Sequence, residues 1–480
     1  MQSTDKTKAI MTFFEKICAI PHGSTNEAAL RDYLRGWAAE HGFTSDADAA
    51  GNLIIRVPAS PGKEDKPTLV LQGHLDMVCE KTPQSNHDFS KDAIRIVEDG
   101  EWIRADNTTL GADNGLGLAM AMAAATDPEL KHPPLELLMT VEEETGLIGA
   151  NGLQPGFVKG RILLNLDSED LGYFTVGCAG GRDARMQLKL ERKPVPAGLQ
   201  ALKVVVGGLE GGHSGVDINL GRANAIKLLA RMLVRAAGKV EMWGLSGNGG
   251  SAHNAIPRDA SLSIAIKPED VETLHELIGE CGLNMATEYL HTDPNLTVGA
   301  DNIELEGEGI EPASFARMLD YLLALPHGVA AMTPKISTLV ESSCNLATFK
   351  LDNDGLSVLM SQRSSVMSRL HAITDRIGSI ARLAGASFHA SQGYPAWQPN
   401  MDSPLLARCV PLYEKLTGKK AVVEVIHAGL ECGIIGSKYP GMDMISFGPT
   451  IKNPHSPQEK AHMPSVGITW DFLVKLIESY

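Results

Sequence analysis

Histidine and carboxylate side chains follow three short apolar runs in this sequence. His74 and Asp76 come after the first run, Glu142-Glu143-Glu144 after the second, and Asp167 after the third. Runs of this length and composition are typical of strands buried on both faces of an α/β sheet. The carboxyl ends of parallel strands meet in the crevice where such sheets bind ligands. We therefore expect these side chains to lie close together at one edge of a sheet.

Two more residues are expected at the same edge. Asp113 stands at the start of a predicted helix that Gly115 opens, and His455 lies in a late polar segment. The combined set offers imidazole and carboxylate groups without thiolate, which suits zinc, manganese or cobalt. A metal site of this composition is typical of hydrolytic chemistry.

Two pairs within this set suggest a division of labour. The i, i+2 spacing of His74 and Asp76 on extended backbone places both side chains on one side, so Asp76 can orient the imidazole. In the glutamate run, one carboxylate can bind metal while its neighbour accepts a proton from water and returns it to the leaving group.

Two residues outside this set are candidates for contact with a substrate. His213 lies in the segment Gly211-Gly212-His213-Ser214-Gly215, where its ring could donate a hydrogen bond to a developing oxyanion. Arg363 follows a strand-like run, and its planar guanidinium could hold a substrate carboxylate.

Each of these motifs also has an ordinary structural explanation. Asp113 can cap a helix, the glutamates can form a solvated loop, and Asp167 can belong to a polar loop tip. His213 can be merely exposed, and Arg363 can form a surface salt bridge. Considered one at a time, the residues leave these alternatives open.

The composition limits the classes of function. The 480 residues carry a formal net charge of -15, which disfavours binding to nucleic acid or to an anionic membrane surface. No apolar run approaches the ~18 residues that span a bilayer, and the N-terminus lacks the uninterrupted apolar segment of a secretory signal. The 7 cysteines are scattered without a C-x-x-C pair, as free thiols are. We predict a cytoplasmic protein with no nucleic-acid or membrane partner.

The order of the predicted elements divides the chain into two domains. Strand-like runs separated by helices, such as 116–125, indicate an α/β fold with a helix-covered, mostly parallel sheet. After Gly180-Gly181, alternating runs such as 202–206 indicate an antiparallel sheet that carries helices. The α/β pattern returns from Pro395 onward. We predict a discontinuous first domain of residues 1–183 and 396–480, and an inserted α+β domain of residues 184–395.

Six short motifs occur in order along nearly the whole chain: Gly73-His74-Leu75-Asp76, Gly111-Ala112-Asp113-Asn114-Gly115, Glu143-Glu144-Thr145-Gly146, Asn165-Leu166-Asp167, Gly212-His213-Ser214-Gly215 and Asn254-Ala255-Ile256-Pro257. This series closely resembles that of the bacterial aminoacylhistidine dipeptidases, also called Xaa-His dipeptidases or carnosinases, of the two-zinc dipeptidase, aminoacylase and carboxypeptidase clan. The resemblance implies a zinc-peptidase catalytic domain and an inserted lid domain.

The resemblance also implies a set of metal ligands. His74 and Asp167 look like ligands of one zinc ion, and Glu144 and His455 look like ligands of the other. Asp113 resembles the carboxylate that bridges the two ions. Zinc is therefore the expected metal, and cobalt or manganese could substitute for it.

The remaining roles follow from the same resemblance. Glu143 is similar to the general base of the family, and Asp76 is similar to the carboxylate that orients the first histidine ligand. His213 resembles a lid residue that reaches the scissile carbonyl, often across a dimer interface, so a homodimer is expected. Asn254 and Arg363 resemble substrate-binding residues.

The implied activity is metal-dependent hydrolysis of dipeptides, preferentially Xaa-His, by a metal-bridged water with Glu143 as general base. One alternative is an N-acyl amino acid deacylase that uses the same metal site. Another is a metal-dependent binding or assembly module without activity. A base candidate at Glu143, directly beside a ligand candidate at Glu144, argues against this last alternative.

Overall fold

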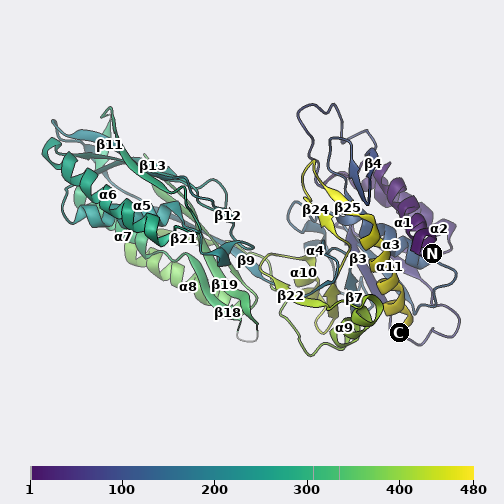
Figure 1. Cartoon of the computed structure of the whole chain (residues 1–480). Helices are drawn as coiled ribbons and strands as arrows, with labels where there is room; N and C mark the ends of the chain where they lie inside the picture. The colour runs from purple at the N-terminus through teal and green to yellow at the C-terminus, as the bar shows by residue number, and fades with distance from the viewer. Residues whose placement is uncertain (1–2, 306, 334–335) are drawn as a thin grey trace. The chain divides into compact units, whose positions relative to one another are not determined.

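The structure of the chain is a computed structural model that describes residues 3–305, 307–333 and 336–480. It divides into two compact units. Unit 1 consists of Met1–Cys178, Trp397–Val425 and Leu430–Tyr480, and unit 2 consists of Ala179–Ala396 and Ile426–Gly429. Both units appear in Figure 1, coloured by position along the chain.

Unit 1 contains two sheets and the helices that pack on them. Its helices are α1 (Ser3–Cys18), α2 (Ala28–Glu40), α3 (Ala112–Thr126), α4 (Ile148–Gly152), α9 (Pro404–Thr417), α10 (Glu431–Lys438) and α11 (Met463–Glu478). The strands of its large sheet are β1 (Thr44–Ala47), β2 (Leu53–Val57), β3 (Leu69–His74), β6 (Leu135–Thr140), β7 (Ile162–Asn165), β8 (Tyr173–Cys178), β22 (Val422–Ile426) and β23 (Asp443–Ser446).

The large sheet has the strand order β1-β2-β6-β3-β7-β23-β8-β22. Its centre is parallel, because β3 pairs in parallel with both β6 and β7, and β7 with β23. The pairs β1 with β2, β2 with β6, and β23 with β8 are antiparallel. The predicted parallel sheet is thus the central part of a mixed sheet.

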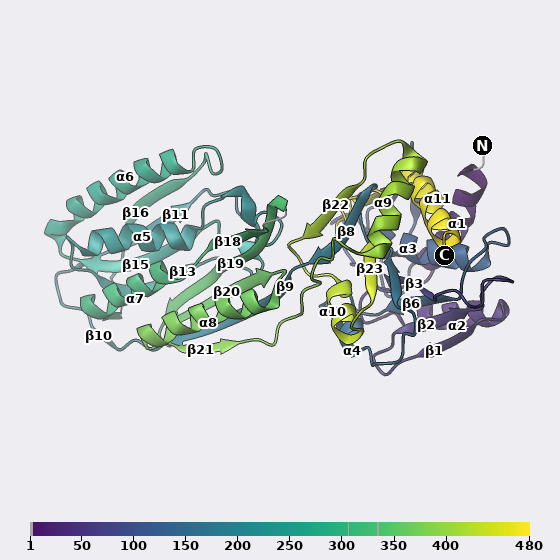
Figure 2. The ribbon, with the colours of Figure 1, turned by 90° about the horizontal axis from the view of Figure 1, so that it is seen from below.

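Helices cover both faces of this sheet, which explains why its central strands β3 and β6 are buried throughout. Every residue of β3 and β6 is buried. Helices α1, α3 and α11 lie to one side of the sheet, and α4 and α10 lie to the other (Figure 2). On α1, the helically spaced residues Ile10, Phe14 and Ile17 are completely buried. Each such side chain contributes about 1.5–3 kcal/mol of burial free energy.

A small second sheet in unit 1 joins segments from distant parts of the chain. Its strands are β4 (Ile96–Asp99), β5 (Trp102–Ala105), β24 (Ile451–Lys452) and β25 (Lys460–His462), in the order β24-β25-β5-β4. The pairing of β25 with β5 fixes the loop between β24 and β25, which contains His455.

Unit 2 is built on a sheet of 11 strands with the main order β16-β11-β15-β13-β19-β20-β9-β21. Its strands are β9 (Gly180–Leu188), β10 (Arg192–Pro194), β11 (Gln200–Gly207), β13 (Trp243–Gly249), β15 (Ala260–Ile266), β16 (Thr297–Ile303), β17 (Glu308–Ile310), β18 (Gly328–Thr333), β19 (Ile336–Asp352), β20 (Gly355–Ser364) and β21 (Ser387–Ala390). Two further strands, β12 (Gly212–His213) and β14 (Ala255–Ile256), form a separate pair.

The neighbouring strands of this sheet run antiparallel, as the alternating sequence pattern predicts. The unit's α-helices lie on one side of the sheet (Figure 1): α5 (Ala225–Ala237), α6 (Val271–Glu288), α7 (Pro312–Ala324) and α8 (Met367–Ala384). Two short 3-10 helices cover Ile218–Leu220 and Pro268–Asp270. One continuous apolar core, which includes Leu229, Leu262, Phe315 and Ile377, joins helices and sheet.

Among the residues that the structure describes, none of the helices combines the length and the apolar character that a membrane span requires.

Candidate metal centre

The carboxyl ends of the three adjacent parallel strands bring the first candidates to one edge of the large sheet. His74 is the last residue of β3 and pairs with Thr140 of β6. Gln72 of β3 pairs with Asn165 of β7, so Asp167, two residues beyond Asn165, continues level with His74. The predicted convergence of these strand ends is therefore a consequence of the register.

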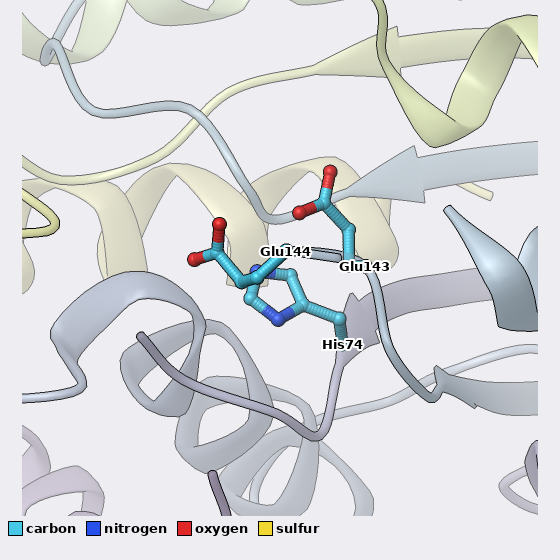
Figure 3. Close-up of side chains that lie close together, drawn as sticks. All are labelled: His74, Glu143 and Glu144. Atoms are coloured by element: carbon cyan, nitrogen blue, oxygen red, sulfur yellow. The ribbon is translucent and has the colours of Figure 1, made fainter. Parts of the chain in front are cut away.

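The glutamate run forms a tight loop directly after β6. Glu142 has a φ of 49°, and Gly146, with a φ of 131°, adopts a backbone conformation that glycine tolerates best. This loop turns Glu143 and Glu144 back toward the strand ends. Both side chains gather beside the imidazole of His74, as Figure 3 shows, with potential ligand atoms within 4.8 Å of one another.

Asp113 lies in the first turn of α3 but has non-helical backbone angles, with φ -83° and ψ 106°. The next residue, Asn114, donates a hydrogen bond from Nδ2 to the backbone oxygen of Leu166, at 2.7 Å. Asn114 also packs closely on Gly73, where an added Cβ would lie 2.1 Å from Oδ1 of Asn114. Small residues at this crossing let α3 approach β3 and hold Asp113 over the strand ends.

His455 reaches the same place from the loop between β24 and β25. Its φ of 58° lies in the left-handed region, which residues other than glycine adopt only rarely. The side chain is 50% exposed, whereas that of His74 is only 1% exposed. One imidazole of the site is therefore buried and the other borders solvent.

The five predicted ligands form two groups that share one carboxylate. In the first, Nε2 of His74 lies 3.0 Å from Oδ1 of Asp113 and 3.3 Å from Oδ1 of Asp167. In the second, Nε2 of His455 lies 3.2 Å from Oδ2 of Asp113 and 2.9 Å from Oε1 of Glu144. The two oxygens of Asp113 thus face different histidines, as a bridging carboxylate requires.

The hydrogen-bonding geometry of these groups fits a bound cation. Nδ1 of His74 lies 2.9 Å from the backbone oxygen of Asp76, which can only accept, so Nδ1 carries a proton. In the neutral ring, Nε2 then directs its lone pair at the oxygens of Asp113 and Asp167. A bound cation would satisfy all three lone pairs, and Nε2 of His455 with its two carboxylates would offer a second such set.

The pKa directions indicate an excess of negative charge at the site. Burial lowers the pKa of His74, but the neighbouring Asp167, Asp113 and Asp76 outweigh it and raise this pKa well above its usual value. Hydrogen bonds that the ring of His455 donates to the carboxylates of Asp113 and Glu144 raise the pKa of His455 to about 11. Burial raises the pKa of Asp167 to about 7. A divalent cation would relieve this accumulation of carboxylates.

Asp76 joins the strand that carries His74 to the glutamate loop. Its Oδ1 lies 3.4 Å from Nδ1 of His74 and accepts the backbone N–H of Glu143 at 2.9 Å. Its Oδ2 accepts the N–H of Glu144 at 3.2 Å and the hydroxyl of Ser24 at 2.7 Å. The carboxylate of Asp76 thus lies beside the ring of His74, whose Nδ1 hydrogen-bonds the backbone oxygen of Asp76, and it also contacts the glutamate loop, which the sequence did not suggest.

Glu143 completes the centre as a carboxylate that neither group of ligands uses. Burial raises its pKa well above that of an ordinary glutamate, and the negative charges of Asp167, Glu431 and Glu144 add to the increase. A carboxylate with an elevated pKa can accept a proton and hold it near neutral pH.

A buried polar layer beneath the ligands was not predicted from the sequence. Gln72 donates to Oε2 of Glu431 at 2.6 Å and accepts from Nδ2 of Asn165 at 2.5 Å. Thr140 also donates to Oε2 of Glu431, at 2.7 Å. Gln72 and Asn165 stand two residues before His74 and Asp167, and the period of two on a strand is the one signal that could have identified them.

Unit 2 holds the three residues predicted to contact substrate. His213 in β12 pairs with Ala255 of β14, directly after Asn254, and the backbone oxygen of Asn254 accepts the N–H of Ser214 at 2.8 Å. The Nδ1 of His213 accepts the N–H of Val216 at 3.1 Å, which leaves Nε2 to carry the proton of the neutral ring. Burial and the charge of Arg363 lower the pKa of His213.

Arg363 lies in β20 and is only 7% exposed. Its Nη1 donates a hydrogen bond to the hydroxyl of Tyr394 at 2.8 Å. A Cβ added at Gly215 would lie 3.0 Å from Cε1 of His213 and 3.3 Å from Nε of Arg363, so these two side chains border the same glycine. The burial of Arg363 contradicts the surface salt bridge that the sequence left open. Its guanidinium is instead buried and hydrogen-bonded to Tyr394.

Comparison with known proteins reveals full-length similarity to peptidases. The sequence profile described as "Peptidase family M20/M25/M40" matches residues 70–479. The cytosol non-specific dipeptidase of Escherichia coli strain K12 is 40% identical over 465 residues, which are 97% of this chain and 96% of that protein.

Solved structures give the same result. Aminoacylhistidine dipeptidase from Vibrio alginolyticus is similar with a TM-score of 0.93 and 41% identity, over 98% of this chain and 96% of that chain. Aminopeptidase PepT from Bacillus cereus shares the fold alone, with a TM-score of 0.56 and 16% identity, over 98% of both chains.

Proposed function

Because the chain belongs to the peptidase family M20/M25/M40, we propose that it is a metal-dependent dipeptidase with a preference for Xaa-His substrates. Asp113 carries this proposal, since its two oxygens face the two histidines of separate ligand groups. The relatives of 40% and 41% identity, named as dipeptidases, support hydrolysis of dipeptides. Their names differ in substrate range, and the preference for a C-terminal histidine is our proposal.

The residues of unit 1 would hold two divalent ions. We propose His74 and Asp167 for one ion, Glu144 and His455 for the other, and Asp113 between them. Zinc is the proposed metal, with cobalt or manganese able to replace it. Such ions lower the pKa of bound water toward ~7 and polarise a substrate carbonyl.

Glu143 would move the proton. Its carboxylate accepts a proton from the attacking water as the new C–O bond forms at the peptide carbon. The raised pKa lets Glu143 keep that proton until the C–N bond breaks and the amine nitrogen of the leaving amino acid takes it. The carboxylate of Asp76 accepts the backbone N–H of Glu143 and so fixes the position of Glu143. The base therefore lies in place before substrate binds.

Unit 2 would supply groups that recognise the substrate. The neutral imidazole of His213, protonated on Nε2, can donate a hydrogen bond to the oxygen that becomes negative during attack. The buried guanidinium of Arg363 can hold the carboxylate of a dipeptide, which would restrict cleavage to short substrates. We propose Asn254 as a further substrate contact and unit 2 as a lid.

Two properties beyond the reaction are also proposed. The relative from Escherichia coli is named a cytosol enzyme, and we propose the cytoplasm for this chain as well. The homodimer predicted from the family resemblance stays a prediction, which sedimentation of the purified chain would test.

Metal analysis and a substrate panel on one purified sample test the proposed function. The panel contains Ala-His, dipeptides without histidine, a tripeptide, and acetylated amino acids. We expect about two equivalents of divalent metal per chain, fastest release of histidine from Ala-His, and loss of activity on chelation that added zinc restores. Preferential cleavage of the acetylated compounds would indicate a deacylase, and a metal-loaded chain inert on the whole panel would exclude both activities.

A further inference from the structure

Glu459 makes an unusual set of contacts next to the metal centre. Its side chain lies in the loop between β24 and β25 and is only 2% exposed. Oε2 accepts the backbone N–H groups of Leu110 and Gly111, at 2.7 and 3.1 Å. Oε1 accepts those of Ala112 and Asp113, at 2.8 and 3.4 Å. One carboxylate therefore receives four consecutive backbone donors.

These donors belong to the turn that begins α3. Gly111 adopts a left-handed φ of 70°, so successive N–H groups of the turn can point to one side. The first N–H groups of a helix lack partners within the helix, and a carboxylate at this end also interacts favourably with the helix dipole. Burial raises the pKa of Glu459 to about 7, while the N–H groups of Leu110, Gly111 and Ala112 oppose this rise.

The same contacts connect two residues of the metal centre. Asp113 is the last of the four donors, so the carboxylate of Glu459 fixes the backbone from which Asp113 projects. Glu459 also stands four positions after His455, in the same loop. The imidazole of His455 in turn lies 3.2 Å from Oδ2 of Asp113. Glu459 thus ties the turn that carries Asp113 to the loop that carries His455.

We propose that Glu459 is a positioning residue that sets the relative position of Asp113 and His455, and that metal affinity depends on it. This inference rests on the proposed function, because it assumes that those two residues hold metal. It assigns to Glu459 no contact with substrate and no proton transfer. Outer carboxylates of this kind typically change metal affinity by about 10- to 100-fold when they are removed.

Glu459→Gln is the informative variant. It keeps the size of the side chain but replaces one acceptor oxygen with an NH2 group that faces backbone donors. Metal affinity is measured by competition with a chelator, and the visible absorption of the cobalt-loaded chain reports the geometry around the metal. We expect Glu459→Gln to lose about 10- to 100-fold in affinity and to show an altered cobalt spectrum.

Glu136 offers a matched control in the same unit. It is also 2% exposed, and its Oε2 accepts the backbone N–H groups of Lys159 and Gly160 at 2.8 and 2.9 Å. Glu136 is the second residue of β6 and lies at the end of the strand opposite to the metal centre. Glu136→Gln should lower thermal stability but keep the affinity and cobalt spectrum of the unmodified chain.

Three outcomes would overturn the inference. Glu459→Gln could bind metal as tightly as the unmodified chain, Glu136→Gln could lose as much affinity as Glu459→Gln, or the cobalt spectrum could stay unchanged. If Glu459→Gln does not fold, Glu459→Asp takes its place, and unchanged affinity in that variant overturns the inference equally. An unmodified chain that binds no metal would contradict the proposed function itself, before any variant is compared.

Discussion

The carboxylate of Asp76 accepts the backbone N–H of Glu143 at 2.9 Å, although the two residues are 67 positions apart. The bond joins the end of β3 to the loop after β6. The carboxylate of Asp76 therefore holds the backbone of Glu143, the proposed base, and also lies beside the ring of His74, a proposed metal ligand. A change at Asp76 should disturb both.

We expect Asp76→Asn to lower kcat by about 10- to 100-fold and to weaken metal binding, because an amide cannot accept at both positions. Steady-state kinetics and chelator competition measure the two effects. Ser24→Ala is the control, since it removes only the hydroxyl that donates to Oδ2 of Asp76. A kcat for Asp76→Asn equal to that of the unmodified chain would show that this contact does not position the base.

Glu143→Gln should separate proton transfer from metal binding. The amide cannot accept the proton of water, so we expect kcat to fall by roughly 100- to 10,000-fold while the metal content stays unchanged. Elemental analysis and kinetics on one preparation provide both values. Glu142→Gln is the neighbouring control and should stay active. Near-normal turnover by Glu143→Gln would exclude Glu143 as the base.

Metal affinity should rise with pH. Ligands bind metal in their deprotonated forms. The pKa of His455 is raised to about 11 and that of Asp167 to about 7, so near neutral pH a cation must displace protons from them. Protons compete more strongly at lower pH, so affinity falls between about pH 8 and about pH 6.

Titration calorimetry measures this effect directly. Binding heats in two buffers of different ionisation enthalpy give the number of protons released, which we expect to be positive at neutral pH. Affinity that is independent of pH, with no proton release, would contradict the ligand assignment of these two residues.

Gly73→Ala should weaken metal binding although it replaces none of the proposed metal ligands. The added Cβ would lie 2.1 Å from Oδ1 of Asn114, so Asn114 and the turn with Asp113 must shift. We expect a loss of about 1–3 kcal/mol in unfolding free energy and weaker metal binding. Thermal unfolding with and without metal tests both.

Gly36 in α2 provides the control for this substitution. A Cβ added at Gly36 would meet open space, so Gly36→Ala should be neutral or stabilise by ~0.4–1 kcal/mol. Gly73→Ala with normal stability and affinity would mean that α3 adjusts freely on β3.

Arg363→Lys tests recognition of the substrate carboxylate. Lysine keeps the charge but not the planar pair of donors, so we expect KM to rise by roughly 10- to 100-fold with a smaller change in kcat. Dipeptides with an amidated C-terminus should show no such difference. Arg369→Lys is the control, because Arg369 is 53% exposed and pairs with Glu341 in the same unit. An equal rise in KM for the amidated substrates would exclude the proposed contact.

Local sequence patterns were sufficient to predict which strand ends converge at one edge of the large sheet. A short apolar run is typical of a central strand, and polar residues directly after such a strand lie at its end. This reasoning placed His74, Asp167 and the glutamate run at one edge, and the register of β3 with β6 and β7 agrees. The grouping of ligands came from the family resemblance and stays a proposal, which the contacts of Asp113 support.

Tertiary structure decided what no local pattern encodes. Asp113 and His455 are 342 positions apart, and they meet because β25 pairs with β5 in a sheet that the sequence did not reveal. Glu431 and Glu459 have no periodic signal, since each acts through hydrogen bonds to distant segments. Periodicity reports which face of a strand is buried, whereas contacts between remote segments depend on how the whole unit packs. The sequence alone therefore determined which types of side chain form the site and at which edge of the sheet they lie. The packing of unit 1 determined which remote segments contact them.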